Sequence, residues 1–240
     1  MRAAGLLASA LLCAAAGASA GEARILLTGV FAPELLRLSE SRSFVEYAEQ
    51  GSLRASYPMR HGFGGELGVE YDVTRRFGMR ASVSYARRLG DGRYEARLPH
   101  PLYLDRDRLV NGSVGGLEYR EAALSLDVVL ILGSGPVQVS LLGGGAFFRV
   151  DAEVAGEIRK TEAYPYDTVE VRGLGTRRLG ASPIGYGGAV GLDWRLSRHF
   201  GLGAQARYNR ARARLRASED ETIAFDAGGL QAGLGLRVIF

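Results

Sequence analysis

The chain ends in Leu230-Gln231-Ala232-Gly233-Leu234-Gly235-Leu236-Arg237-Val238-Ile239-Phe240, and this stretch decides the fold. Every second residue from Leu230 to Phe240 is apolar, and the residues between them are small or polar, with Ile239 as the exception. A period of two indicates a β-strand with one apolar face. A soluble strand can alternate in this way because one face packs on a core. A transmembrane barrel strand must alternate, because one face meets lipid and the other meets a polar interior.

The same alternation recurs in two related hairpins. Residues 64–78 (GGELGVEYDVTRRFG) match residues 187–201 (GGAVGLDWRLSRHFG), and the match continues to Tyr85 and Tyr208. Each copy predicts a strand, a tight turn and a second strand. The copies lie too far apart for the 20- to 50-residue period of a solenoid. They therefore indicate two hairpins of one closed sheet.

Extending this pattern in both directions predicts eight strands. They cover residues 24–38, 61–73, 78–88, 118–132, 137–154, 183–196, 201–216 and 227–240. The connections alternate between short (74–77, 133–136, 197–200) and long, polar segments (39–60, 89–117, 155–182, 217–226). Short periplasmic turns opposite long extracellular loops are typical of outer-membrane barrels.

The first predicted strand contains Pro33, which cannot donate to a β-ladder. We therefore expect a bulge or an early strand end there. Part of Ser43–Pro58 is also a candidate hairpin above the membrane.

The first twenty residues have the features of a secretory signal peptide. Arg2 supplies the positive charge, residues 6–16 form the apolar region, and residues 18–20 (ASA) form a small-residue cleavage site. A lipoprotein signal at Cys13 is the competing interpretation, but Leu12 occupies the position where a small residue should precede the cysteine. Cys13 is the only cysteine, so a mature domain of residues 21–240 has no thiol for disulfides, catalysis or metal binding.

The composition narrows the function classes. The mature segment has no apolar run of the roughly 20 residues that a spanning helix needs. The net charge of +4 is too even to favour nucleic acid as a partner. No metal-ligand spacing of the usual kinds appears, and we expect no cofactor.

Aromatic residues fall near both ends of the predicted strands. If the chain starts in the periplasm, Tyr71, Trp194 and Phe240 lie near the periplasmic rim and Tyr85, Tyr186 and Tyr208 near the outer rim. Two aromatic girdles bounding an apolar band about 25 Å tall are typical of a lipid interface.

These motifs resemble the small eight-stranded outer-membrane barrels of the OmpA/OmpX-like superfamily. The resemblance rests on the Gly-rich hairpin at Gly64–Tyr85, its copy at Gly187–Tyr208 and the closing Gly235–Phe240. It implies an all-β, eight-stranded antiparallel up-and-down transmembrane barrel in the bacterial outer membrane. It also implies recognition of Phe240 by the barrel assembly machinery, membrane lipids as partners and a monomeric state.

Alternation places a set of charged residues on the inward face. The predicted network comprises Glu66, Glu70, Asp72, Glu121, Asp127, Asp193, Arg80, Arg195, Arg207 and Arg237, with Gln205 and Gln231. An eight-stranded barrel is only wide enough for side chains to fill, so these charges must pair. The network is either a salt-bridged plug or a gated path for protons or ions.

The seventh predicted strand continues outward into an arginine ladder. Arg210, Arg212, Arg214 and Arg216 share the lipid-facing parity of Tyr208. Arginine costs about 2 to 4 kcal/mol at the bilayer midplane and about 0 to 1 near the interface. The ladder is therefore a candidate site for lipopolysaccharide phosphates, which guanidinium groups bind in bidentate fashion. The alternative is a solvated strand extension, partly neutralised by Glu219, Asp220 and Glu221.

We expect a non-enzymatic structural or surface-interaction protein with a filled interior. The first alternative is a narrow gated channel for small solutes or ions. The second is a lipid A-modifying enzyme that would use His61, Ser56 and an acid at the outer rim. No tight catalytic motif supports the enzyme.

Overall fold

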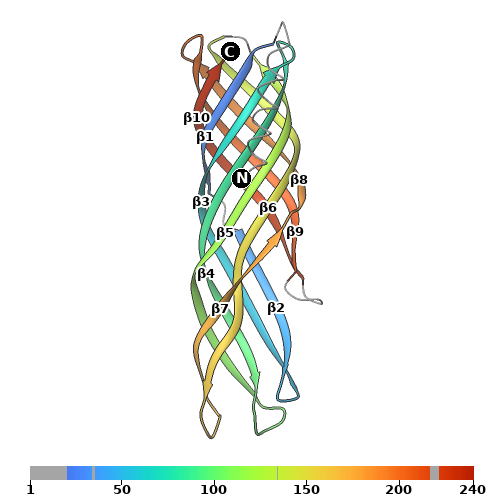
Figure 1. Ribbon diagram of the computed structural model, residues 1–240, viewed down its shortest axis with the longest axis vertical. Helices are drawn as coiled ribbons and strands as arrows, with labels where there is room; N and C mark the ends of the chain where they lie inside the picture. Colours follow the sequence, from blue (N-terminus) through green and yellow to red (C-terminus); the bar gives the residue numbers. More distant parts are fainter. Residues whose placement is uncertain (1–20, 34–35, 134, 217–221) are drawn as a thin grey trace, which may run out of the picture.

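The computed structural model describes residues 21–33, 36–133, 135–216 and 222–240, and all regular structure in these ranges is β (Figure 1). No helix among the described residues is long and apolar enough to cross a membrane. The described strands are β1 (Ala23–Ala32), β2 (Leu36–Glu46), β3 (Glu49–Asp72), β4 (Phe77–Pro99), β5 (Asp107–Leu132), β6 (Val137–Glu162), β7 (Val169–Ala181), β8 (Ile184–Arg195), β9 (Phe200–Arg216) and β10 (Thr222–Ile239). The predicted signal peptide, including Cys13, lies outside the described residues.

Eight of these strands form a closed antiparallel ring, as predicted. Their order around the ring is β1, β3, β4, β5, β6, β8, β9 and β10, and β10 pairs with β1 to close it. The short turns after β3, β5 and β8 lie at the same end as the carboxy terminus (Figure 1). The up-and-down topology explains this placement, because sequence neighbours pair directly and every second turn returns to the same rim.

The strands are longer than the sequence pattern predicted. The four long connections lie on one side, but most of their residues continue the strands rather than forming loops. β5 and β6 have 26 residues each. An apolar band about 25 Å tall needs only about 9 to 11 residues of a tilted strand. More than half of each of these strands therefore extends beyond the membrane.

Two prolines divide wall strands at the point where this extension begins. β1 ends at Ala32, directly before Pro33, and β2 then continues along the same partner, β3. β8 begins at Ile184, directly after Pro183, and β7 precedes it along the same partner, β6. The expected strand end at Pro33 and the expected pairing within residues 43–58 both occur. A proline has no N–H to donate, so each wall strand is interrupted there.

We call the extension the tower. It consists of β2, β7 and the distal segments 49–59 of β3, 90–99 of β4, 107–117 of β5 and 148–162 of β6. The hairpin of β9 and β10 covers only its base (Figure 1).

The polarity of the two sheet faces inverts where the tower begins. On β4 the outward residues are apolar in the membrane half (Met79, Val83, Tyr85) and charged in the tower (Arg87, Arg93, Glu95, Arg97). The inward residues of β4 show the opposite change, from polar (Arg80, Ser82, Arg88) to largely apolar (Tyr94, Ala96, Leu98). Along β9, outward Leu202 and Tyr208 give way to Arg210, Arg212 and Arg214, while inward Gln205 and Arg207 give way to Ala211, Ala213 and Leu215. Along both strands, inward and outward side chains continue to alternate through this change. The surrounding medium changes from hydrocarbon to water, so the apolar face turns from outside to inside.

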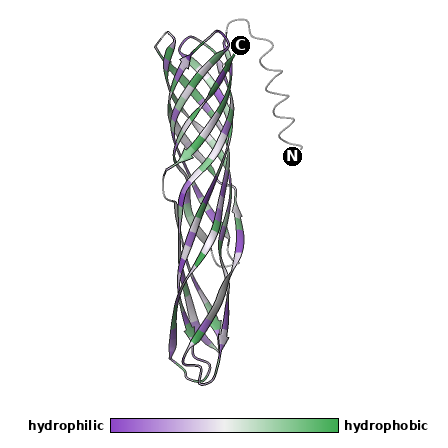
Figure 2. Cartoon of the chain, turned by 90° about the vertical axis from the view of Figure 1, so that its left-hand side faces the viewer, coloured by the Kyte–Doolittle hydropathy of each residue, from purple (hydrophilic) through white to green (hydrophobic). Residues whose placement is uncertain are grey.

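The tower has an apolar core of its own. Leu53, Tyr57, Met59, Leu117 and Phe148 are at most 1% exposed and belong to one contiguous cluster. In Figure 2 the membrane half and the tower are seen as successive segments of one continuous column.

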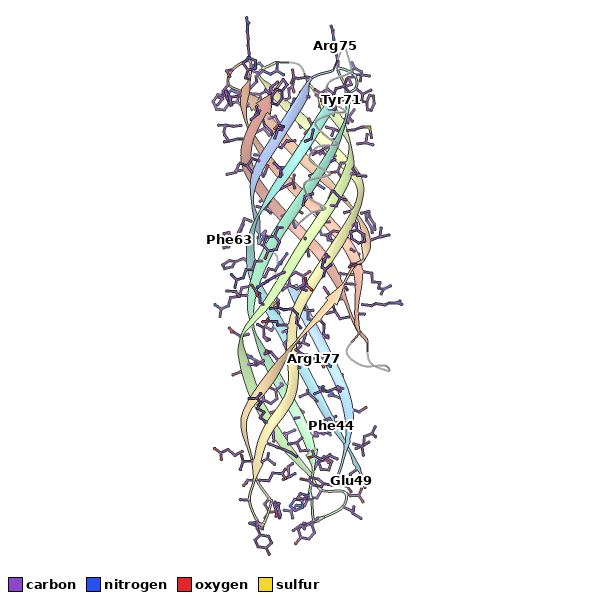
Figure 3. The ribbon with its side chains drawn as sticks, viewed as in Figure 1. Phe44, Glu49, Phe63, Tyr71, Arg75 and Arg177 are labelled. Carbon is purple, nitrogen blue, oxygen red and sulfur yellow. The ribbon has the colours of Figure 1, made fainter. Side chains whose placement is uncertain are left out.

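Among the described residues, β2 pairs with β3 but no backbone ladder joins it to β6 or β7, and side chains close the tower on that side. Arg177 on β7 forms a 2.7 Å ion pair with the buried Glu40 on β2, and the Arg42 guanidinium donates to the Gly156 carbonyl of β6 at 3.1 Å. Nearer the tip, Lys160 pairs with Glu46 and Glu162. Figure 3 shows Arg177 and Phe44 in this part of the molecule.

Candidate functional site

The membrane half of the barrel is filled by ion pairs that cross its axis. Arg80 donates to Glu70 from Nε at 2.7 Å and to Gln205 from Nη1 at 3.0 Å. Arg207 lies 2.6 Å from Asp127, with both side chains at most 3% exposed. Glu70 lies on β3, which pairs directly with β4, whereas the Arg80–Gln205 and Arg207–Asp127 contacts cross the barrel between strands that do not pair. These two contacts therefore tie opposite parts of the ring together.

A second set of contacts closes the barrel toward the periplasm. Arg237 donates to Asp193 at 2.8 Å and to Thr28 at 3.1 Å. Arg24 reaches Glu70 at 3.1 Å and Asp72 at 2.6 Å. Beside these charges, Val129, Ile131, Leu142 and Ala189 form a small buried apolar cluster.

The predicted inward residues lie inside the barrel with one exception. Glu66, Glu121 and Gln231 are buried, and Glu121 accepts from Tyr119 at 2.7 Å and from the Gly228 backbone at 3.0 Å. Among the described residues, Glu66 Oε1 is buried without a hydrogen-bond partner. The exception is Arg195, which lies at the periplasmic mouth of the barrel. Arg195 ends β8 at the rim, where the wall stops, and its exposed side chain pairs with Glu22.

The prediction missed Arg24 and Arg88. Arg24 shares the inward parity of Leu26 and Thr28, so alternation in the first strand could have identified it. Arg88 is 2% exposed and donates to the Gly228 carbonyl at 3.2 Å. Its parity matches that of Arg80, but the predicted strand 78–88 ends at this residue, where parity no longer indicates a face.

The residues of the predicted aromatic girdles lie on the barrel wall, most of them exposed. Tyr85, Tyr186, Trp194, Tyr208 and Phe240 are exposed on the outer surface, and Tyr71 is half-buried at the periplasmic rim. Phe31, Phe63 and Phe147 are further exposed aromatics toward the tower. Figure 3 places Tyr71 near the short turns and Phe63 about midway along the molecule.

Arginines stand immediately beyond the outer girdle. Two residues beyond Tyr85, Phe147 and Tyr208 on their strands, the outward residues are Arg87, Arg149 and Arg210, respectively. Arg120 lies directly opposite Arg87 in the backbone ladder of β4 and β5. We call Arg87, Arg120, Arg149 and Arg210 the arginine belt.

Acidic residues neutralise only part of this region. Arg87 and Arg120 share Glu118, and Arg210 pairs with Asp226 at 2.8 Å. Arg212 and Arg214 are exposed on β9 and line a hollow beside Ser182 and Pro183. Within the described ranges, no carboxylate lies within ion-pair distance of either residue. The side chain of Arg216 and the acids at 219–221 lie outside the described residues.

His61 packs against the exposed aromatic rings of Phe31 and Phe63. Its ring lies 5.9 Å from those of Phe31 and Phe63. In the part of the chain that the structure describes, no hydrogen bond joins His61 to Ser56 or to an acid. The same residues contain no cluster of three or more His, Cys, Asp or Glu side chains that could hold a metal ion.

A closed eight-stranded ring with an outward apolar band between aromatic girdles is suited to a bilayer. The fold is that of a small outer-membrane barrel. Solved structures agree. OprG from Pseudomonas aeruginosa superposes with a TM-score of 0.53 at 11% identity, covering 93% of this chain and 98% of that chain.

Two further structures align over similar lengths. Neisserial surface protein A has a TM-score of 0.45 at 14% identity, covering 93% of this chain and 99% of its own. A major outer membrane protein from Thermus thermophilus has a TM-score of 0.46 at 12% identity, covering 92% and 100%. No protein-family model matches the sequence, and no curated protein matches it significantly. OprG is an outer membrane protein, and the barrel fold expected from the sequence agrees with its fold.

Proposed function

We propose that the protein is a closed, non-enzymatic barrel of the bacterial outer membrane that holds a rigid tower above the cell surface. The observation that carries this proposal is the continuous filling of its axis. Ion pairs occupy the membrane half, and an apolar core occupies the tower.

The same filling argues against the gated channel. An eight-stranded barrel has an interior just wide enough for side chains. An ion entering from the periplasm would meet the cluster around Val129 and Ile131, then the Arg207–Asp127 pair, then the tower core. Moving a charge through apolar surroundings is strongly unfavourable.

Planar-bilayer recording tests this proposal. We expect the refolded wild type to give no stable single-channel steps. The double variant R80A/R207A should also stay silent, because the tower core still blocks the axis. Reproducible current through wild type would contradict the proposal, and current through the variant alone would show that the ion pairs are a gate. A gel shift on heating verifies that each sample is folded.

We propose the outer-leaflet glycolipid as the membrane partner. The ladder of Arg210, Arg212, Arg214 and Arg216 begins at Arg210 and continues outward from the arginine belt, which stands at the edge of the apolar band. Arginine is tolerated at that height, and lipid phosphates also lie there. Guanidinium groups bind phosphate in bidentate fashion.

Copurified lipopolysaccharide measures this contact. Replacing all four ladder arginines with serine should reduce it clearly. A matched variant, R54S/R93S/R97S, removes exposed arginines from the tower wall, farther from the membrane, and should retain the wild-type amount. Equal retention by both variants would remove the ladder from the proposal.

Lipid A from producing cells should keep its mass, because His61 is packed in the girdle without a hydrogen-bonded serine or acid among the described residues. A changed mass of lipid A would support the enzyme alternative.

We also propose that Phe240 serves in assembly, since its backbone N–H donates to the Ala23 carbonyl at 2.9 Å where the ring closes.

A further inference from the structure

One wall of the tower carries two rows of polar side chains that run across four strands. The first row is Ser39, Ser56, Arg93 and Ser113, and the second is Ser41, Arg54, Glu95 and Asn111. All eight side chains are exposed on the outer surface. Arg97 continues the outward series on β4.

The wall is hollowed along these rows. One hollow of about 770 Å³ is lined by both rows, and a second of about 760 Å³ continues toward Arg60 and Asp91. The hollows share Ser56, Arg93 and Ser113, so they form one trough.

Arg54 and Arg93 of the trough, with the neighbouring Arg97, differ from other arginines of the tower. Arg60, which also lines the trough, pairs with Asp91 at 2.9 Å. Arg178 pairs with Glu153 at 2.6 Å, and Arg106 pairs with Asp167 at 3.1 Å. Among the described residues, by contrast, Arg54, Arg93 and Arg97 form no ion pair and no side-chain hydrogen bond. Their donors are available to a ligand.

Arg54 and Arg93 favour a polar ligand with acidic groups, and Glu95 and the Arg60-paired Asp91 are the exposed carboxylates of the lining. Serine and asparagine side chains donate and accept hydrogen bonds, and arginine binds carboxylate or sulfate in bidentate fashion. Neither row carries an aromatic residue, and Tyr94, which also lines the first hollow, is buried at 8% exposure. The rows therefore offer no exposed ring on which a nucleobase could stack or a protein partner could anchor. Neighbouring strands lie about 4.8 Å apart, so each row spans roughly 14 Å, the length of a short run of sugar rings.

The height of the trough separates it from the lipid. Ser56 lies seven residues along β3 from Phe63 of the outer girdle. At about 3.3 Å per residue and a tilt of about 40°, that distance is roughly 18 Å above the apolar band. We propose that the trough binds an acidic oligosaccharide, sulfated or carrying uronic acids, that reaches the cell from outside.

Calorimetry on the refolded, full-length barrel with a heparin-derived hexasaccharide tests the proposal. The variant R54S/R93S/R97S should bind about tenfold or more weakly, because the charge-assisted contacts of Arg54 and Arg93 and the nearby charge of Arg97 are lost. The control R75S/R76S/R198S removes equal charge from the periplasmic turns and should bind as wild type does. Equal weakening of both variants would show general electrostatic attraction and overturn the site.

A charge-preserving variant separates a built site from a merely basic surface. S39A/S56A/N111A should weaken binding severalfold without changing the salt dependence, and unchanged affinity would overturn the proposal. An uncharged chitin hexasaccharide should not bind. Tighter binding of lipopolysaccharide core oligosaccharide, freed of lipid A, would assign the trough to the cell's own glycolipid and overturn an external ligand. These results are independent of channel activity, so the proposed function can stand or fall separately.

Discussion

Asp127 and Arg207 show how this barrel holds charges inside a membrane. The two residues are 80 positions apart in sequence, and their side chains meet at 2.6 Å in a dry interior. Desolvating each ion costs several kcal/mol, which a close pair offsets and a lone charge does not. The pair fixes which strands face each other across the barrel.

Replacing Arg207 with alanine should lower the free energy of unfolding by about 3–5 kcal/mol, because Asp127 is left buried and unpaired. Urea unfolding followed by the fluorescence of Trp194, the only tryptophan, measures the change. The control R60A breaks the exposed pair with Asp91 and should cost about 0–1 kcal/mol. The double variant D127L/R207M should recover much of the loss. Equal stability of R207A and R60A would refute this account.

At the scale of elements, the tower depends on how β2 meets β6 and β7. Over the described parts of these strands no backbone ladder joins them at the seam, and ion pairs on inward-facing side chains close it. Glu162 also accepts from Tyr47 at 2.9 Å and from the buried Arg108 at 2.8 Å. The tip is therefore an electrostatic closure above an apolar core.

This closure should weaken in acid. Burial alone would raise the pKa of Glu162, but hydrogen bonds from Lys160 and Tyr47 outweigh it, and the net pKa lies below its ordinary value. A lowered pKa gives stabilisation that is present at neutral pH and is lost as pH falls through the folded value, below about 4.5. Burial likewise opposes the charge on Lys160, but its hydrogen bonds to Glu46 and Glu162 prevail and raise its pKa. That contribution persists at neutral pH and is lost above about 10.5.

Spin labels at S43C on β2 and T176C on β7 would follow the seam. The interspin distance should be narrow at pH 7 and broaden below pH 4, and K160M should broaden it already at pH 7. A distance that stays narrow throughout would show that apolar packing alone closes the tower.

At the scale of the whole molecule, the protein is one continuous β-structure in two media. The strands cross the bilayer with polar residues inside and then cross water with apolar residues inside. Hydrogen-bonded strands resist proteases, which need locally unfolded chain. The surface-exposed half should therefore behave as a folded domain.

Trypsin on intact cells distinguishes a tower from flexible loops. We expect cleavage after Arg106, whose exposed side chain follows the turn between β4 and β5. The strand residues Arg54, Arg93 and Arg97 should remain uncut for the same exposure time. Rapid cutting at any of these three would contradict the tower, and R106Q should remove the expected product.

The ring of eight strands could be predicted because, within the membrane, the apolar residues alternate regularly and always face outward. The tower could not, because beyond Arg87 and Arg210 the apolar residues change face. The stretch 210–216 (RARARLR) reads as an arginine ladder, yet Ala211, Ala213 and Leu215 are its buried half. A bulge near Gly116, with φ of 73°, shifts the phase of β5 further.

The interior charges were largely predictable from parity on β3 and β9. The rim position of Arg195 was not, because parity does not show where a wall ends. The trough could not be predicted, since its rows join four strands whose register depends on bulges beside Gly62 and Gly92. Only the paired sheet brings Ser39 level with Ser113.

The inversion of polarity also fixes how deeply the barrel sits in the membrane. If the molecule sank by one pair of residues, Arg87 and Arg210 would approach hydrocarbon, at a cost that rises toward about 2–4 kcal/mol for each arginine at the midplane. If it moved outward by the same step, Tyr71 and Trp194 would enter the hydrocarbon layer. Phe63 and Tyr208 would leave that layer and be exposed to water. The residues of the barrel wall thus determine the immersion depth. A membrane of another thickness would have to deform to match the apolar band.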